Sequence, residues 1–198
     1  MTSEQTKSTQ SLETTAPEAP IWLRLWRSQQ ENIWLVAIAL ILAILIRLFV
    51  AEPRYIPSDS MLPTLHTGDR LLVEKVSYLL HPPQTGDIVV FEPPEKLQKQ
   101  GYSKNQVFIK RVIGKPGDVV GVHKGKVYVN KQPLSESYIA EPPAYELVSA
   151  PVPEGKFFVM GDNRNDSNDS HVWGFLPQQN IIGRAVFRFW PLNRVGIV

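Results

Sequence analysis

One continuous apolar segment, residues 33–51, constrains the fold of this 198-residue chain more than any other feature. It reads IWLVAIALILAILIRLFVA and contains a single charge, Arg47. At about 1.5 Å of rise per residue, a helix of this length spans roughly 28 Å, close to the ~30 Å hydrocarbon core of a bilayer. Arg47 lies one turn from the end, where its long side chain can reach the interface. We therefore expect a transmembrane helix over residues 33–51.

Two other readings of this segment are a buried core helix and a cleaved signal peptide. The segment is long for the apolar part of a signal peptide, and its exit, LFVAEPRY, carries no small-x-small cleavage pattern. Arg24 and Arg27 precede the segment, whereas Arg54 beyond it is accompanied by Glu52. This bias favours a cytoplasmic N-terminus and places residues 52–198 on the outer or luminal side.

The composition changes on either side of the apolar segment. Residues 1–20 are rich in Ser, Thr, Glu and Pro, which predicts a disordered tail, and residues 1–32 together form a disordered to amphipathic N-terminal segment. Residues 52–198 hold short runs of Val, Ile and Phe between Gly, Pro and Asp turns, which predict β-strands. The expected strands are 70–76, 87–91, 107–114, 118–123, 126–130, 156–160 and 182–190.

The predicted fold class is therefore mainly β. A single N-terminal transmembrane helix precedes an antiparallel β-sheet domain with a small β/loop insertion at about residues 123–153. A hairpin is expected to turn at Lys124-Gly125. The polar or proline-rich stretches 93–106 and 131–153 are expected to be exposed loops.

Several classes of function are excluded by composition. The net charge of +2 and the lack of a dense basic stripe argue against nucleic acid as a partner. The absence of cysteine rules out disulfides, a thiol nucleophile and a thiolate zinc site. A calcium loop starting at Asp166 fails, because His171 and Pro177 stand where glycine and glutamate are needed. No cofactor is expected.

The expected strand VFIKRVI places a lysine where apolar side chains dominate. Side chains alternate along a strand, so Lys110 shares a face with Phe108 and Val112. Burial disfavours the ammonium form and lowers a lysine pKa, for example from ~10.4 to ~8 at roughly 3.3 kcal/mol. An edge-strand lysine that protects against aggregation is the other reading.

The stretch PSDSM, residues 57–61, supplies the hydroxyl that such a lysine could serve. None of the four histidines lies in a recognisable catalytic frame. A serine–lysine pair needs only a positioned hydroxyl, a neutral amine and donors for an oxyanion. Without further context, PSDSM also fits a simple surface turn.

Three blocks together resemble the signature sequences of the type I signal peptidases. They are IPSDSMLPTLHTGD (residues 56–69), FIKRVIGKPGD (108–118) and GDNRNDSNDSHVWGFLP (161–177). The wording NDSHVWGFLPQQNIIGRA is most similar to the cyanobacterial and plant plastid branch. The resemblance extends over most of residues 52–198, which makes plasma and thylakoid membranes the two alternatives, with the N-terminus on the stromal side in a plastid.

The resemblance implies a role for each matching residue. Ser60 matches the nucleophile, Lys110 the general base, and Ser58 the hydroxyl that joins the Ser60 N–H in the oxyanion hole. Ser167 matches a serine that orients the lysine amine, and Asp169 a supporting carboxylate. Two further expectations go with these roles: Arg111 pairs with Asp169, and Met61 packs below the site and contributes to substrate binding.

Two positions depart from the commonest pattern of the family. Asp59 stands where many bacterial members carry glycine, and we expect its carboxylate to point to solvent. His171 stands where many members carry arginine, which makes its support of Asp169 dependent on pH. The branch that this chain resembles often has histidine there.

The resemblance implies a membrane-bound serine endopeptidase that removes signal peptides of exported preproteins after A-x-A sites. Its expected partners are signal peptides and the bilayer, with proximity to the export translocon. Ser60 follows Ala51 by nine residues, so the link reaches at most ~30 Å. Two alternatives are a self-cleaving serine–lysine repressor, which would need a DNA-binding module in front, and a membrane-tethered β-domain that binds peptides without catalysis.

Overall fold

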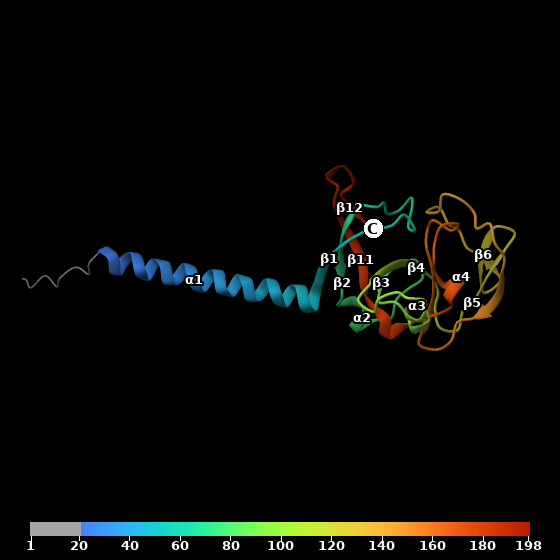
Figure 1. Ribbon diagram of the computed structural model, residues 1–198, viewed down its shortest axis with the longest axis horizontal. Helices are drawn as coiled ribbons and strands as arrows, with labels where there is room; N and C mark the ends of the chain where they lie inside the picture. Colours follow the sequence, from blue (N-terminus) through green and yellow to red (C-terminus); the bar gives the residue numbers. More distant parts are fainter. Residues whose placement is uncertain (1–20) are drawn as a thin grey trace, which may run out of the picture. The chain divides into compact units, whose positions relative to one another are not determined.

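The computed structural model describes residues 21–198 (Figure 1). Its contacts divide the described part of the chain, after Ala43, into two units, which are described separately. The disordered tail expected over residues 1–20 lies outside the described residues.

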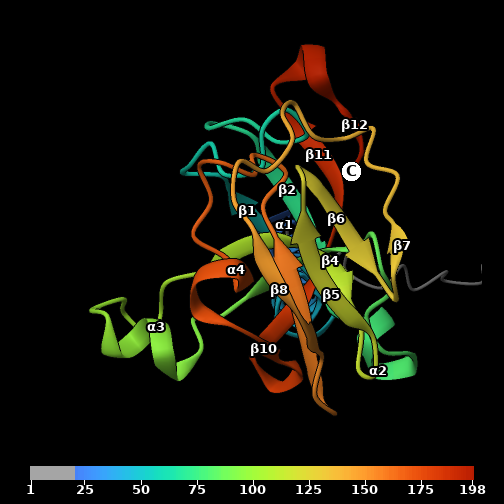
Figure 2. The same cartoon turned by 90° about the vertical axis from the view of Figure 1, so that its right-hand side faces the viewer.

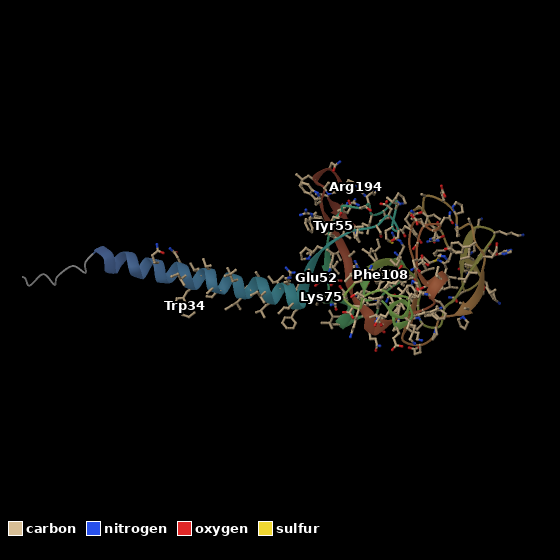
Figure 3. All side chains as sticks on the ribbon, viewed as in Figure 1. Trp34, Glu52, Tyr55, Lys75, Phe108 and Arg194 are labelled. Atoms are coloured by element: carbon tan, nitrogen blue, oxygen red, sulfur yellow. The ribbon has the colours of Figure 1, made fainter. Side chains whose placement is uncertain are left out.

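The long apolar segment is helical, as the hydropathy predicts. Helix α1 covers Ile21–Leu45 and continues as a π-helical turn, η1, over Ile46–Val50. Asn32–Val50 has a mean hydropathy of 2.9, and none of this stretch is buried against protein. Trp34, for example, is 70% exposed (Figure 3). This exposure argues against the buried core helix, and the segment is long and apolar enough to cross a membrane.

The larger sheet is antiparallel throughout and has the order β1-β2-β11-β3-β4-β9-β10, with β12 paired to β11 (Figure 2). Its strand β11 returns from late in the chain to lie between β2 and β3. The bounds are β1 Ala51–Tyr55, β2 Arg70–Glu74, β3 Ile88–Phe91, β4 Phe108–Gly114, β9 Lys156–Met160, β10 Leu176–Pro177, β11 Ile181–Trp190 and β12 Gly196–Ile197.

A second, four-stranded sheet has the order β7-β6-β5-β8 (Figure 2). Its strands are β5 Val119–His123, β6 Lys126–Val129, β7 Gln132–Pro133 and β8 Leu147–Pro151. The hairpin between β5 and β6 turns at Lys124-Gly125, where both residues have positive φ, 48° and 71°. A two-residue turn of this kind matches the twist of paired strands, and the predicted hairpin is confirmed.

Short helical turns connect the strands. They are α2 Ser77–Leu80, α3 Glu95–Lys99, α4 Ser170–Trp173, η2 Gln178–Asn180 and η3 Leu192–Arg194.

Both faces of β4 are covered, which its sequence predicted. Ile109 packs in a core cluster with Ile88 and Val90, whereas Val112 belongs to a different cluster with Val89 and Phe91. The strand therefore lies between two apolar layers. Its polar residues are held in fixed positions near the middle of the domain.

The seven expected strands all form, with ends that differ by at most two residues from the prediction. Two expected loops were predicted wrongly. The stretch 93–106 contains α3, whose Leu97 is completely buried, and the stretch 131–153 contributes β7 and β8. In both places, scattered apolar side chains among prolines and charges were enough to dock the segment on the core.

Candidate active site

Ser60 lies in the turn that follows β1, and its neighbours fix it firmly. Ile56 and Met61, on either side, are 2% and 0% exposed and belong to the same core cluster. The Ile56 N–H donates to the Asp69 carbonyl at 2.9 Å, and the Leu65 N–H donates to the Met61 carbonyl at 2.9 Å. Two buried apolar anchors thus hold a polar turn at the surface of the sheet.

Lys110 projects from β4 directly at this turn. Its Nζ lies 2.6 Å from Ser60 Oγ and donates to the Ile109 carbonyl at 3.0 Å. The side chain is only 3% exposed. Burial lowers the pKa of Lys110 to about 8, although the charges of Asp169 and Asp162 act in the opposite direction. Two residues that are far apart in the sequence therefore form a contact suited to proton transfer.

Ser58 and Asp59 complete the turn on its open side. Ser58 Oγ lies 3.4 Å from Ser60 Oγ and is exposed. The exposed Asp59 carboxylate accepts from Thr67 Oγ1 at 2.8 Å and from Thr67 N at 3.3 Å. Its position in solvent is the one expected, and a threonine hydroxyl stabilises it there.

Asp169 organises the loop that faces the serine turn. Its buried carboxylate accepts hydrogen bonds from Gly161 N at 2.8 Å, from Ser167 Oγ at 2.6 Å and from His171 Nδ1 at 2.7 Å. It also caps α4 by accepting from His171 N at 3.1 Å. Ser167 was expected to orient Lys110, but its hydroxyl donates to Asp169 instead.

Arg111 was expected to pair with Asp169, but it pairs with Asp162 instead. Arg111 donates to Asp162 through Nε at 2.8 Å and through Nη2 at 2.6 Å, and Asp162 is completely buried. Thr64 Oγ1 donates to the same carboxylate at 2.5 Å. Asp162 thus joins β4 to the segment that follows Ser60, in the two-pronged geometry that arginine and carboxylate favour.

The loop after β9 also grips the serine turn through its backbone. Asn163 N donates to the Ser60 carbonyl at 3.1 Å, and Asn163 Nδ2 donates to the Asp59 carbonyl at 3.1 Å. A Cβ on Gly161 would overlap both the Ser60 carbonyl and the Ser167 hydroxyl. Glycine is required at position 161, because the loop after β9 and the serine turn pack directly against each other there.

Residues 134–146, which we call the clasp, hold this loop from the other side. Glu136 accepts from Arg164 Nη1 at 2.9 Å and Nη2 at 2.6 Å, and both side chains are buried. Tyr138 donates to Glu136 at 3.0 Å and lies under the Arg111 guanidinium, 4.1 Å from it. The clasp therefore contacts both the loop after β9 and strand β4.

The clasp makes two further contacts with the same loop. The Tyr145 ring stacks on His171 with centroids 4.2 Å apart, and the Ala144 N–H donates to Asn165 Oδ1 at 2.8 Å. Together with the ion pair, these contacts make the clasp part of the support of the site.

A cleft of about 300 Å³ opens above the serine and the lysine. Its walls come from the serine turn, from the start of β4 and from Tyr102 and Asn168, which share a hydrogen bond of 3.2 Å. A larger hollow, of about 750 Å³, lies beside α3 and includes neither Ser60 nor Lys110. Met61 was expected to bind substrate, but it is 0% exposed and forms the floor of the turn.

The sequence therefore predicted the contact between Ser60 and Lys110, but not all of the residues that hold these two in place. The residues that it did not single out are Thr64, Glu136, Tyr138, Asp162, Asn163 and Arg164. Asp162, Asn163 and Arg164 lie inside the block GDNRNDSNDS, so their polar density was a signal for them. Glu136 and Tyr138 lie in a stretch that resembles a loop, and no local pattern marks them.

Comparisons with known proteins identify the family of this chain. Residues 29–190 match the family described as "Signal peptidase, peptidase S26". The chain is 67% identical over 171 residues to a probable signal peptidase I-1 of Synechocystis sp., covering 86% of this chain and 87% of the relative. It is 50% identical to thylakoidal processing peptidase 1 of Arabidopsis thaliana, covering 80% of this chain and 47% of the relative.

A solved structure is also similar. The crystal structure of a signal peptidase I from Enterococcus faecalis V583 matches with 32% identity and a TM-score of 0.44, covering 52% of this chain and 95% of that chain. With a buried lysine against a turn serine, and with the family match over most of its length, the chain belongs to the signal peptidase family, peptidase S26.

Proposed function

We propose that this chain removes signal peptides from preproteins with Ser60 as nucleophile and Lys110 as general base. The observation that carries the proposal is the buried amine, 2.6 Å from the hydroxyl of the turn serine. A neutral amine accepts a proton, whereas an ammonium cannot, and burial favours the neutral form. The peptide-binding domain without catalysis is not favoured, because it gives no reason for a desolvated lysine at a hydroxyl.

The first half of the reaction is acyl transfer to Ser60. Lys110 Nζ takes the hydroxyl proton as Oγ bonds to the scissile carbonyl carbon, and the carbonyl π pair moves to oxygen. Collapse of this intermediate breaks the C–N bond, and Lys110 returns the proton to the leaving amine. In the second half, Lys110 takes a proton from water as the water oxygen bonds to the ester carbon. The bond between that carbon and Ser60 Oγ then breaks, which releases the cleaved segment as its acid, and Lys110 returns the proton to Ser60 Oγ.

The oxyanion is stabilised by Ser58 and by the backbone of the serine turn. Ser58 Oγ, 3.4 Å from Ser60 Oγ, is near enough to donate to an oxygen on the attacked carbon. The Ser60 N–H is the second donor. A donor of this kind typically contributes ~3–4 kcal/mol to lowering the barrier.

The substrate binds as an added strand along the start of β4. Strand β4 pairs with β3 from Phe108 to Arg111, but it pairs with β9 only from Arg111 onwards, so one edge of its first half is open. This edge faces the catalytic cleft and a neighbouring cleft of about 310 Å³, lined by segments 53–57 and 107–109. Main-chain hydrogen bonds to an extended peptide fit such an edge, and the small clefts suit the small residues of an A-x-A site.

The location follows from the anchor. Residues 33–50 span the membrane, the residues before them lie on the cytoplasmic or stromal side, and residues 51–198 form the catalytic domain on the outer or luminal side. Ser167, Asp169 and Arg111 support the loop and strand around Lys110. The anchor keeps the enzyme in the bilayer where preproteins leave the export translocon.

One experiment tests the catalytic assignment. Purified wild type, Ser60→Ala and Lys110→Ala are given a preprotein with an A-x-A site, and mass spectrometry locates the cut. We expect cleavage after the small residue by the wild type only, with both variants folded by circular dichroism. Cleavage by Ser60→Ala at the wild-type rate would show that another group is the nucleophile.

A further inference from the structure

A small apolar tip stands out on the surface of the catalytic unit. Within α2 and the residue before it, Val76, Leu79 and Leu80 are 37%, 80% and 82% exposed. Tyr78 points the other way and donates to Asp87 at 3.1 Å. Single exposed apolar residues are common on soluble domains, but two adjacent leucines exposed to this extent at the apex of a turn suit a partner that is itself apolar.

The position of this tip is fixed by the register of the first two strands. Ala51, the first residue of β1, pairs with Glu74, the last residue of β2. The next residue, Lys75, donates its backbone N–H to the Val50 carbonyl at 2.9 Å. The apolar segment ends at Val50. The tip therefore begins directly beside the point where the chain leaves that segment.

Side chains reinforce this connection. Lys75 Nζ donates to the Arg47 carbonyl at 3.4 Å and lies 2.8 Å from a Glu52 carboxylate oxygen, and Figure 3 shows Glu52 and Lys75 next to each other. Arg54 Nε donates to the same carboxylate at 2.6 Å. Partial burial alone would raise the pKa of Glu52, but the hydrogen bonds from Lys75 and Arg54 lower it, so the carboxylate stays charged.

The tip is held rigidly. Glu74 Oε2 accepts hydrogen bonds from Val76 N at 3.1 Å and from Ser77 N at 3.0 Å, and the His81 N–H donates to the Ser77 carbonyl at 3.0 Å. An ordered turn loses little conformational entropy when its leucines enter an apolar phase. Lys75 and Arg54, which both contact Glu52, supply positive charge of the kind that anionic lipid headgroups attract.

We propose that Val76, Leu79 and Leu80 insert into the bilayer beside the exit of the transmembrane helix. This inference rests on the membrane anchoring proposed above. The helix alone is a single tether, about which the catalytic domain can rotate. A second contact through the tip restricts that rotation and fixes the height and orientation of the Ser60 cleft above the bilayer.

The chain offers a clean test, because it contains no cysteine. Single substitutions Leu80→Cys, Ile41→Cys and Val148→Cys are labelled with a nitroxide in the full-length protein in phosphatidylcholine–phosphatidylglycerol vesicles. Val148 is 88% exposed in β8 and serves as the water-facing control, and Ile41 reports the span. Collision with oxygen and with a water-soluble nickel chelate measures the depth of each label.

We expect the labels at positions 80 and 41 to collide preferentially with oxygen, and the label at position 148 with the nickel chelate. A lipid signal at position 41 with a water signal at position 80 would overturn the tip contact and leave the anchor intact. Water signals at all three positions would overturn the membrane anchor itself, and the tip contact with it.

A kinetic measurement tests the consequence. The double variant Leu79→Ser, Leu80→Ser should raise the KM for a vesicle-embedded preprotein by about tenfold, because the apolar contact is lost. Its kcat on a short soluble peptide should equal that of the wild type, as should both parameters of Val148→Ser. An unchanged KM for the embedded preprotein would show that the tip does not orient the site.

Discussion

The proposed mechanism depends on the environment of Lys110. A lysine with an ordinary pKa of about 10.5 is neutral in only about one molecule in a thousand at pH 7.5, whereas one with a pKa of about 8 is neutral in roughly a quarter. Burial between two apolar layers produces this difference. The negative charges of Asp162 and Asp169 raise the pKa of Lys110, but less than burial lowers it. Both carboxylates accept hydrogen bonds from other groups, Asp162 from Arg111 and Asp169 from Gly161 N.

The first prediction concerns the pH dependence of the reaction. In the proposed mechanism the neutral amine of Lys110 is the active form, so kcat/KM for a preprotein peptide should rise with pH through about 8 and then reach a plateau. Initial rates between pH 6 and pH 10, with folding monitored in parallel, provide the measurement. A profile that is flat across this range would contradict a lysine base.

The second prediction concerns stability. The folded state lowers the pKa of Lys110, so the charged lysine destabilises it at every pH below about 8, and this penalty fades as the pH rises towards 10.5. Lys110→Met should therefore be inactive yet more stable, by about 1–3 kcal/mol at pH 7 and by less at pH 10. Urea unfolding at the two pH values measures this. A variant less stable at pH 7 than the wild type would show that the lysine does not strain the fold.

The third prediction concerns Gly161. An added methyl group would overlap the Ser60 carbonyl and the Ser167 hydroxyl, so Gly161→Ala should push the two loops apart and lower kcat by roughly 10- to 100-fold. Gly196→Ala is the matched control, because a Cβ there meets nothing within 4 Å. If both variants kept full activity, close contact at this glycine would not matter for catalysis.

At the scale of elements, the strands with dense Val, Ile and Phe were predictable from the sequence, and those without it were not. Strand β1, AEPRY, contains a proline and two charges and forms because it pairs at the edge with β2. Strand β8, LVSAP, pairs only with β5 and is largely exposed. In both cases long-range pairing overrides a weak local signal.

In the candidate site too, some residues could be predicted from the sequence and others could not. Ser60 and Lys110 could be predicted because each lies in a distinctive block. The partner of Arg111 could not, because it depends on register: Arg111 pairs with Met160, which brings Asp162 within reach of the guanidinium. A shift of the register would move Asp162 away from the guanidinium, and no pattern within one strand reports that register.

The fourth prediction concerns the clasp. Glu136→Ala leaves the buried Arg164 guanidinium without its carboxylate, which should lower the free energy of unfolding by about 3–5 kcal/mol. Activity should also fall at temperatures where the variant remains folded, because Arg164 holds the Gly161 carbonyl at 3.0 Å. Glu154→Ala, in an exposed turn, is the control. Thermal unfolding and kcat are measured for both variants. If Glu136→Ala behaved like Glu154→Ala in both measurements, the clasp would not support the site.

At the scale of the whole molecule, we expect the catalytic unit and the apolar helix to perform separable tasks. Residues 44–198 form a compact unit of their own, so the fifth prediction is that a protein starting at Ala51 keeps its kcat on a short soluble peptide. On a vesicle-embedded preprotein, kcat/KM should drop by about 100-fold, because the bilayer no longer concentrates enzyme and substrate on one surface. Equal losses on both substrates would mean that the anchor is needed for folding instead.

Strand β11 occupies the middle of the large sheet, although it is made almost last. The ribosome completes β2, β3 and the Lys110 strand long before residues 181–190 exist, and β3 has no neighbour on that side until they arrive. Non-local pairing of this kind is slow and comes late in folding. A nascent chain whose apolar helix is still entering the membrane therefore has an unfinished sheet. The sheet that contains Lys110 can therefore be completed only after residues 181–190 have been synthesised and have paired with β2 and β3.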